Sequence, residues 1–363
     1  MNDRDLYVDG AAALSAFLDE IEAEALLAID TEFVREKTYF PQLCLLQIAS
    51  SGLIGCVDCL AIADMRPLFE HLLRPECCWI LHSSRQDLEV IYQHTDRLPG
   101  RLIDTQVAAG LAGYAPQIGL QELAADLLGI RLDKDYTRTD WSRRPLPRAA
   151  LAYAYDDVRS LTALWKTLER RLQALGRLEW AQQDFALQLR SAPVTPTAAI
   201  WARLKGLRSL DSRQRAAALG LVDWRETRAR QRNRPRRWIL SDDALLEIAA
   251  ALPDSPRALA AVPGLPPRLT ERFGKELVAA VRTGADDESR RLADELFVVE
   301  RPDRQRLREL QAGVQARAAE LGIQPEVLAT RQELTDLLTR RPAPRISQTW
   351  RSAELRDLLP VET

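Results

Sequence analysis

The chain of 363 residues is too long for one ordinary hydrophobic core and predicts two or three domains. Hydrophobic residues make up 46% of the sequence, enough for sizeable cores, and the abundance of Leu, Ala and Arg favours a helix-rich protein. The formal net charge of −2 excludes a globally basic protein, so any argument for nucleic-acid binding has to rest on local charge.

The pattern of apolar residues places most strands in the first hundred residues and helices throughout. Short apolar runs, with a hairpin signal at Ser51-Gly52, predict strands at 26–33, 43–49, 53–57, 79–82 and 102–103. Helical spacing predicts helices at 11–23, 64–73, 84–93, from Asp104 onward, 119–128 and 147–174. Strands that alternate with helices predict a mixed α/β sheet flanked by helices, and the sequence after it is almost entirely helical.

Two proline- and polar-rich breaks divide the helical part of the chain. The segment 191–196 contains Pro193 and Pro196 and is the predicted linker after a first domain of residues 1–190. A second break lies near residues 283–287. The sequence therefore predicts further helical regions at 197–284 and 290–363.

Residues 201–240 form a strongly basic segment. They contain twelve Arg or Lys and three Asp or Glu, a local charge of +9. Such a segment can attract phosphate while the rest of the chain stays acidic. A solvated Arg-rich helical face explains the charge equally well, so the segment alone leaves both interpretations open.

The cysteines and the N-terminus indicate a reducing compartment. Five cysteines, an odd number, do not suggest a disulfide framework, and the single C-x-x-C at Cys56 and Cys59 lacks the second pair of a structural zinc site. We therefore expect buried thiols. The polar N-terminus has no signal-peptide pattern, and no apolar run is long enough to span a membrane. The expected protein is cytoplasmic, with no membrane association and no evident obligatory protein partner.

Asp30 and Glu32 stand at the end of the first predicted strand, two residues apart. Side chains alternate along a strand, so both carboxylates point to one face and repel each other unless a cation compensates. Mg²⁺ would do so, because it prefers carboxylate oxygens. An exposed strand end explains the pair as well.

Two later segments supply similar candidates. Asp87 lies early in a helix that follows a strand, where functional groups of α/β sheets gather, although the helix dipole alone would favour an acid there. Tyr153 and Asp157 are four residues apart and share one helix face, whereas Asp156 points away. A carboxylate and a phenol at one site could hold a metal and position a water. Four carboxylates could surround two ions and promote phosphodiester hydrolysis.

The order of these residues resembles the DEDD exonucleases of the tyrosine subgroup, and within them the ribonuclease D family. The resemblance covers nearly the whole first half of the chain. The segments that carry it are Asp30-Thr31-Glu32-Phe33-Val34-Arg35 with Thr38 to Leu43, His82 to Glu89, Leu102 to Gln106, Leu132 to Lys134 with Thr139 to Leu146, and Tyr153 to Val158.

The resemblance implies a ribonuclease-H-like exonuclease fold and a 3′→5′ exoribonuclease. It implies that Asp30, Glu32, Asp87 and Asp157 hold two divalent ions, Mg²⁺ or Mn²⁺, and that Tyr153 orients the attacking water. The implied substrates are tRNA precursors with 3′ extensions and other structured RNAs, and the products are nucleoside 5′-monophosphates.

The second half of the chain resembles the family more loosely. Residues 197–284 are similar to the helicase-and-ribonuclease-D C-terminal (HRDC) domain, a small helical nucleic-acid-binding module. Residues 290–363 resemble a second, more divergent copy of it.

Residues around the carboxylates are candidate substrate contacts. Phe33 could stack on the terminal base, or pack in the core. His82 could contact phosphate or ribose, although a satisfied packing role is the stronger expectation for it. The full set of expected substrate-binding residues is Thr31, Phe33, His82, Lys134, Arg138, Trp141 and Arg143.

Two other functions use the same residues. A DNA 3′→5′ exonuclease needs the same carboxylates, because DNA has the same phosphodiester and differs from RNA in the 2′-hydroxyl. A non-catalytic RNA-binding scaffold on this fold would be favoured by loss of a carboxylate, and all four are present.

Overall fold

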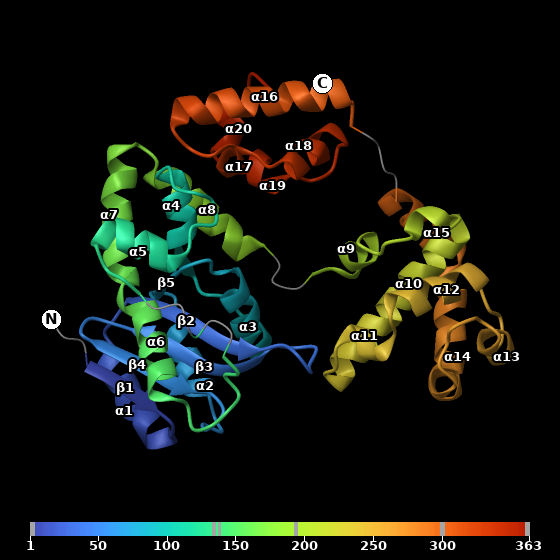
Figure 1. Ribbon diagram of the computed structural model, residues 1–363, viewed down its shortest axis with the longest axis horizontal. Helices are drawn as coiled ribbons and strands as arrows, with labels where there is room; N and C mark the ends of the chain where they lie inside the picture. The colour runs from blue at the N-terminus through green and yellow to red at the C-terminus, as the bar shows by residue number, and fades with distance from the viewer. Residues whose placement is uncertain (1–3, 133–135, 137–138, 192–194, 298–301, 360–363) are drawn as a thin grey trace. The chain divides into compact units, whose positions relative to one another are not determined.

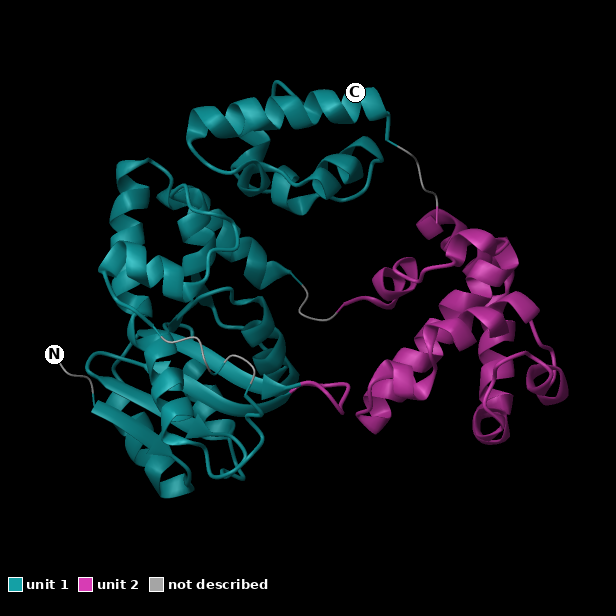
Figure 2. Ribbon diagram, in the orientation of Figure 1, with its two compact units in different colours: residues 1–34, 42–193, 301–363 teal, residues 35–41, 194–300 magenta. Residues whose placement is uncertain are grey.

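The computed structural model describes residues 4–132, 136, 139–191, 195–297 and 302–359. The chain forms two compact units (Figure 2). The first unit comprises residues 1–34, 42–193 and 301–363, and the second unit comprises residues 35–41 and 194–300.

A six-stranded mixed sheet forms the centre of the first unit (Figure 1). The strand order is β1-β4-β3-β2-β5-β6. Strand β3 is antiparallel to both neighbours, whereas the β1–β4, β2–β5 and β5–β6 pairs are parallel. The strands are β1 (Arg4–Val8), β2 (Leu26–Val34), β3 (Gln42–Ala49), β4 (Leu53–Asp58), β5 (Cys78–Leu81) and β6 (Arg101–Asp104).

Two hydrophobic layers cover the sheet. The first layer packs α1, α2 and α3 against one face, and the second packs α4 to α8 against the other. This arrangement confirms the predicted mixed α/β sheet flanked by helices. The helices are α1 (Ala11–Ile21), α2 (Arg66–Leu72), α3 (Arg85–Thr95), α4 (Thr105–Leu111), α5 (Leu120–Leu128), α6 (Arg148–Arg159), α7 (Leu161–Ala174) and α8 (Leu178–Arg190).

The structure corrects two sequence predictions. Strand β1 was not predicted, because its five residues are charged or half-buried except Val8 and carry little apolar periodicity. The single helix predicted at 147–174 is wrong: α6 ends at Arg159 and α7 begins at Leu161. Apolar residues continue at helical spacing across Ser160, so the pattern does not reveal the break.

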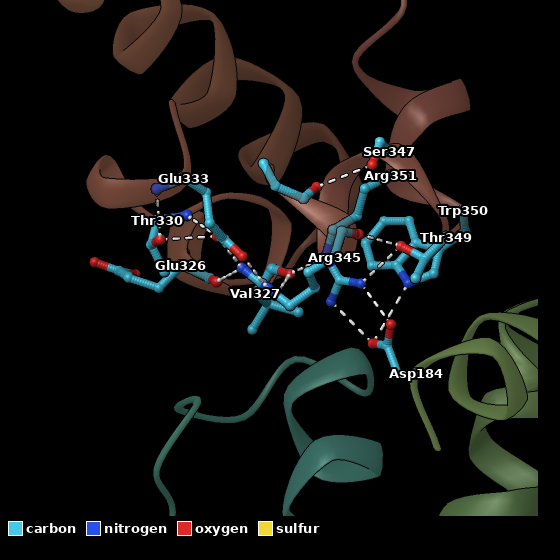
Figure 3. A network of polar contacts seen from close by, with 11 residues as sticks. Asp184, Glu326, Val327, Thr330, Glu333, Arg345, Ser347, Thr349, Trp350 and Arg351 are labelled. Carbon is cyan, nitrogen blue, oxygen red and sulfur yellow. Dashed lines mark hydrogen bonds and ion pairs between the residues drawn. The ribbon is translucent and has the colours of Figure 1, made fainter. Parts of the chain in front are cut away.

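The C-terminal helices of the first unit are anchored on α8 by a buried ion pair (Figure 3). Arg351 is 2% exposed, and its Nη2 donates to Oδ2 of Asp184 at 2.9 Å. Beside it, Trp350 stacks on Trp180 with ring centroids 4.1 Å apart. The Arg351 Nε donates to the carbonyl of Val327 at 2.9 Å, so the buried charge has several polar partners. The helices concerned are α16 (Arg304–Leu321), α17 (Pro325–Leu328), α18 (Arg331–Leu338), α19 (Pro344–Ser347) and α20 (Arg351–Glu354).

The second unit is built around the long helix α10, which packs against α12, α14 and α15. Helices α10 and α14 approach closely at Gly220 and Gly284, where an added Cβ on Gly220 would lie 2.6 Å from the Ala280 carbonyl oxygen. The elements are α9 (Thr197–Ala202), a 3₁₀ turn (Leu207–Ser209), α10 (Ser212–Arg232), α11 (Arg236–Ile239), α12 (Asp242–Ala251), α13 (Pro256–Ala260), α14 (Pro267–Gly284) and α15 (Asp287–Phe297).

The cysteines are free thiols and most of them are buried, as the sequence predicts. All five cysteines are free, and Cys59 alone among them is half-buried rather than buried. Burial raises the pKa of Cys44 and Cys77 to about 11, so these thiols stay protonated at neutral pH. In the described part of the chain, no helix is long and apolar enough to cross a bilayer.

The buried ion pair predicts the stability of the C-terminal helices. Asp184→Ala leaves the Arg351 guanidinium buried without its carboxylate, and we expect a loss of about 3–5 kcal/mol in the unfolding free energy of this region. Urea unfolding followed by hydrogen exchange of α16 to α20 measures it. The matched control is Asp64→Ala, which removes an ion pair with Arg66 in solvent and should change little. Equal effects of the two substitutions would contradict the anchoring role.

Candidate active site

Strand β2 presents two carboxylates on one face. Asp30 and Glu32 are two residues apart, and their partners on β3 are Gln47 and Leu45. The register shifts between Glu32 and Phe33, so regular pairing ends directly after the second carboxylate. Strand β5 pairs with β2 over Leu26–Ala28, which is before the carboxylates. The acidic end of β2 is therefore paired with β3 and lies beyond its pairing with β5.

Asp87 lies in the first turn of α3 and is tied to β2. The hydroxyl of Thr31 donates to Asp87 Oδ1 at 2.6 Å, and both side chains are buried. Thr31 was predicted to contact substrate, and the structure shows that its hydroxyl bonds to Asp87. This hydrogen bond sets the direction of one carboxylate oxygen.

Asp104 fixes the turn that leads into α3. Its carboxylate accepts hydrogen bonds from the backbone N–H groups of Ser83 and Ser84 at 3.1 and 2.9 Å. It also accepts from the N–H groups of Gln106 and Val107, so Asp104 is the N-cap of its own helix. Ser83 has a φ of 66°, a sparsely populated conformation for a residue with a side chain, and the bonds to Asp104 stabilise it.

Helix α6 supplies the remaining pair. Tyr153 and Asp157 lie on the buried face of α6 that packs against β2, β3 and β4. The Tyr153 hydroxyl forms a hydrogen bond with the Asp157 carboxylate. Burial, then the charges of Asp157 and Glu32, raises the pKa of the Tyr153 phenol well above its usual range.

The carboxylates from these elements meet in one open pocket of about 520 Å³. Carboxylate oxygens of Asp30, Glu32 and Asp157 lie within 4.8 Å of one another, and Asp87 lines the same pocket. No Lys or Arg occurs among the described residues that line it. The pocket therefore concentrates negative charge without a counter-ion from the lining.

The electrostatics follow from this geometry. Burial, with the charges of Asp157 and Asp87, raises the pKa of Glu32 to about 9. Burial likewise raises the pKa of Asp87 and of Asp157 to about 7. The pKa of Asp30 is raised well above its usual range by burial and by its acidic neighbours.

These residues fit a divalent-metal site. Carboxylate oxygens are the ligands that Mg²⁺ and Mn²⁺ prefer, and several of them converge within coordinating reach of one another. A bound cation would compensate the repulsion that raises the pKa of each acid. The donor set and its uncompensated charge both match such an ion.

Gln47 is a buried polar neighbour that the sequence analysis missed. It is the β3 partner of Asp30 and is fully buried, and both of its amide atoms lack a hydrogen-bond partner in the described structure. An unpaired amide beside a carboxylate is costly, and a hydrogen bond from it to Asp30 would satisfy the donor. Only the strand register identifies this neighbour.

The segment that carries Trp141 borders the pocket. Trp141 is 2% exposed, and its ring centroid lies 6.3 Å from that of Tyr153. Its buried indole N–H has no partner among the described residues, so a donor is available at the pocket wall.

Arg144 anchors this segment to the sheet, a role that the sequence did not reveal. Its guanidinium forms an ion pair with buried Asp58 at the end of β4, with Nη2 2.6 Å from Oδ1. Its Nη1 also donates to the Trp141 carbonyl at 2.7 Å. Arg144 is therefore a positioning residue for Trp141.

Two further predicted substrate contacts line the pocket but have different surroundings. Phe33 lines the pocket and is partly buried against the first hydrophobic layer. His82 also lines the pocket, but its Nδ1 bonds Thr105 Oγ1 and its Nε2 bonds the Ile118 carbonyl, each at 2.9 Å. Both ring nitrogens are thus engaged within the protein, as expected for a packed histidine.

Of the basic candidates, Arg143 alone is among the described residues, and it is not one of those that line the pocket. Arg143 is exposed and pairs with Asp140 at 3.1 Å. Lys134 and Arg138 lie outside the described residues.

Comparison with known proteins matches two parts of the chain to family models. Residues 6–173 match a 3′-5′ exonuclease model, and residues 214–281 match the HRDC domain.

Relatives named ribonuclease D extend the match along the chain. The chain is 39% identical to ribonuclease D of Gluconacetobacter diazotrophicus over 75% of this chain and 71% of that protein. It is 34% identical to ribonuclease D of Xanthomonas oryzae pv. oryzae over 94% of each chain. The crystal structure of Escherichia coli RNase D, described as an exoribonuclease involved in structured RNA processing, superposes with a TM-score of 0.84 at 28% identity, covering 99% of this chain and 100% of that one.

The raised pKa values predict a pH-dependent stability that metal should reverse. These carboxyls bind protons more tightly in the folded state, so their contribution is fully present below about pH 4 and is lost as pH rises through about 7 to 9. We expect the Tm of the metal-free protein to fall between pH 5 and pH 9, the window that these values define. Mg²⁺ or Mn²⁺ should raise Tm more at the alkaline end. Calorimetry in chelator and in metal measures both effects, and a metal response that does not change with pH would argue against the site.

Proposed function

The chain belongs to the ribonuclease D family, and from that membership we propose a two-metal mechanism, a tRNA-precursor substrate and specific roles for the pocket residues. As a member, it is a 3′→5′ exoribonuclease, a divalent-metal-dependent hydrolase that shortens RNA from its 3′ end. The observation that carries the proposal is a pocket lined by Asp30, Glu32, Asp87 and Asp157, with no basic side chain among its described lining residues.

In the proposed mechanism, the four carboxylates hold two ions, Mg²⁺ or Mn²⁺. When bound, the ions would stabilise charge on the attacking and leaving oxygens of the phosphodiester. The Asp87 carboxylate is oriented by Thr31, and the Asp157 carboxylate by Tyr153. The pKa of Tyr153 is raised, so its phenol stays protonated at neutral pH; its proton is directed at Asp157, and its oxygen can accept a hydrogen bond that orients the attacking water. Hydrolysis at the terminal phosphodiester releases a nucleoside 5′-monophosphate.

Aromatic residues at the pocket would position the 3′-terminal nucleotide. The indole N–H of buried Trp141, which has no partner among the described residues, can donate to a phosphate or ribose oxygen. Phe33, which lines the same pocket, offers a ring for base stacking that does not depend on sequence. Lys134, Arg138 and Arg143 remain predicted phosphate contacts.

We propose that the remaining chain grips structured RNA, with tRNA precursors as the main substrate class. In the proposed organisation, residues 1–190 form the catalytic domain, 191–196 a linker, 197–284 an HRDC-type domain and 290–363 a second, divergent HRDC-like domain. The HRDC match at 214–281 and the charge of +9 over 201–240 support the RNA-binding role.

Substitution of one carboxylate tests the metal assignment. Asp30→Ala should lower kcat roughly a thousandfold or more, because a lost ligand removes several kcal/mol of transition-state stabilisation. RNA affinity should be largely retained. Asp156→Ala is the matched control, since this neighbouring acid pairs with Arg159 and lies outside the pocket lining. Single-turnover cleavage and RNA binding should be measured for both, and unchanged turnover by Asp30→Ala would exclude Asp30 as a metal ligand.

Substrate comparison tests the RNA assignment. A 5′-labelled tRNA precursor with a 3′ extension, an unstructured RNA with the same 3′ end and the matched DNA are incubated with Mg²⁺ or Mn²⁺. We expect stepwise shortening that chelator stops, a lower KM for the precursor than for the unstructured RNA, and much slower shortening of DNA. Equal KM values would oppose the tRNA proposal, preferred DNA cleavage would indicate a DNA exonuclease, and binding without shortening would indicate a scaffold.

A further inference from the structure

Trp238 is the one tryptophan that the fold leaves in solvent. The chain has eight tryptophans, and the structure describes all eight; seven are buried or half-buried, whereas Trp238 on α11 is 61% exposed. Its neighbours Ile239 and Leu240 are both buried and supply the apolar contacts of this turn. Packing within the second unit therefore does not account for the indole.

The surroundings of Trp238 are strongly cationic. Residues 228–238 contain six arginines and no Asp or Glu. Arg234 lies over the indole, 6.0 Å from the ring centroid, and Arg237 has a side chain 79% exposed. Arg234 has no carboxylate ion pair among the described residues, and the highly exposed Arg237 lies 3.8 Å from Asp242, whereas Arg232 lies over the Phe273 ring and its charge acts on Glu276.

The backbone under Trp238 is held rigidly. Arg236 forms a two-pronged ion pair with buried Glu226 of α10, with Nε–Oε1 and Nη2–Oε2 distances of 2.9 Å. On the other side, fully buried Arg225 donates to the Leu240 carbonyl at 3.2 Å and to Asp242 at 2.7 Å. The indole is thus presented on a fixed turn, which lowers the entropy lost when a ligand is bound.

We propose that Trp238 is a stacking platform for an unpaired base of the RNA substrate, with Arg234 and Arg237 contacting the adjacent phosphates. A flat aromatic ring flanked by guanidinium groups binds single-stranded nucleic acid without regard to sequence. The charge around the ring selects a polyanion over an apolar partner. This site rests on the proposed RNA-binding role of the HRDC-type domain and names the residues through which that domain would hold an unpaired segment.

The test uses the full chain, in chelator, with a 5′-labelled RNA hairpin that has a single-stranded 3′ extension. Trp238→Ala should weaken binding about tenfold, whereas Trp238→Phe should retain most of the affinity. Leu292→Ala, which removes another exposed apolar side chain of the second unit, is the control and should bind like the wild type. Thermal melts confirm that each variant is folded. Wild-type affinity in Trp238→Ala would overturn the proposal.

Removal of single bases separates stacking from a structural effect. The wild type should lose affinity when one particular base of the extension is made abasic, and Trp238→Ala should be insensitive to that removal. If Trp238→Ala binds weakly yet responds to every abasic site as the wild type does, the indole acts through the fold and the stacking site is refuted. The salt dependence of Trp238→Ala should match that of the wild type, because no phosphate contact is lost.

A variant with fewer positive charges distinguishes failure of the stacking site from failure of the RNA-binding role proposed for the domain. Arg234→Gln/Arg237→Gln should weaken binding and reduce the salt slope by roughly one to one and a half. If this variant weakens binding while Trp238→Ala does not, the stacking site alone fails. If neither changes affinity, the RNA-binding role proposed for the domain fails with it.

Discussion

The fold has to hold four carboxylates close together in one pocket against their mutual repulsion. Each carboxylate belongs to an element or turn whose position is fixed by packing or by hydrogen bonds. Strand β2 is central in the sheet, α6 packs across β2, β3 and β4, and the turn into α3 is fixed by Asp104. The raised pKa of Glu32 reflects how unfavourable its buried charge is beside Asp157 and Asp87. The rigidity of the sheet and its helices is therefore what makes a metal site possible.

Two other buried acids in the first unit have hydrogen-bond donors within the protein that compensate their negative charge. Burial acts to raise the pKa of Asp58, but hydrogen bonds from Arg144 and Tyr7 outweigh it and the pKa is lowered. Asp104 likewise accepts hydrogen bonds from backbone donors of two segments. Both acids fix loops around the pocket. Their donors lie within the protein, whereas the pocket acids have few donors among the described residues, a difference that supports the proposed metal-binding role of the pocket acids.

Local patterns predicted the parts of the site that depend on neighbours in sequence. The alternation of Asp30 and Glu32 and the helical spacing of Tyr153 and Asp157 are such patterns, and the structure brings three of these acids within 4.8 Å of one another. Contacts between residues far apart in the sequence could not be predicted from such local patterns. The Asp58–Arg144 pair spans 86 residues, and the Asp184–Arg351 pair spans 167. The position of Gln47 beside Asp30 depends on strand register, which apolar periodicity does not specify at a strand buried on both faces.

Negative and positive charge are concentrated in different parts of the sequence. The pocket has no basic side chain among its described lining residues, so these residues supply no attraction for the phosphates of an approaching RNA. With a net charge of −2, the basic segment 201–240 is matched by acidity over the remaining residues. Charge that gathers a polyanion and charge that gathers divalent cations would cancel if they were mixed at one site. The acidic residues of the pocket and the basic segment 201–240 come from different parts of the sequence, as the proposed metal-binding and RNA-binding roles require.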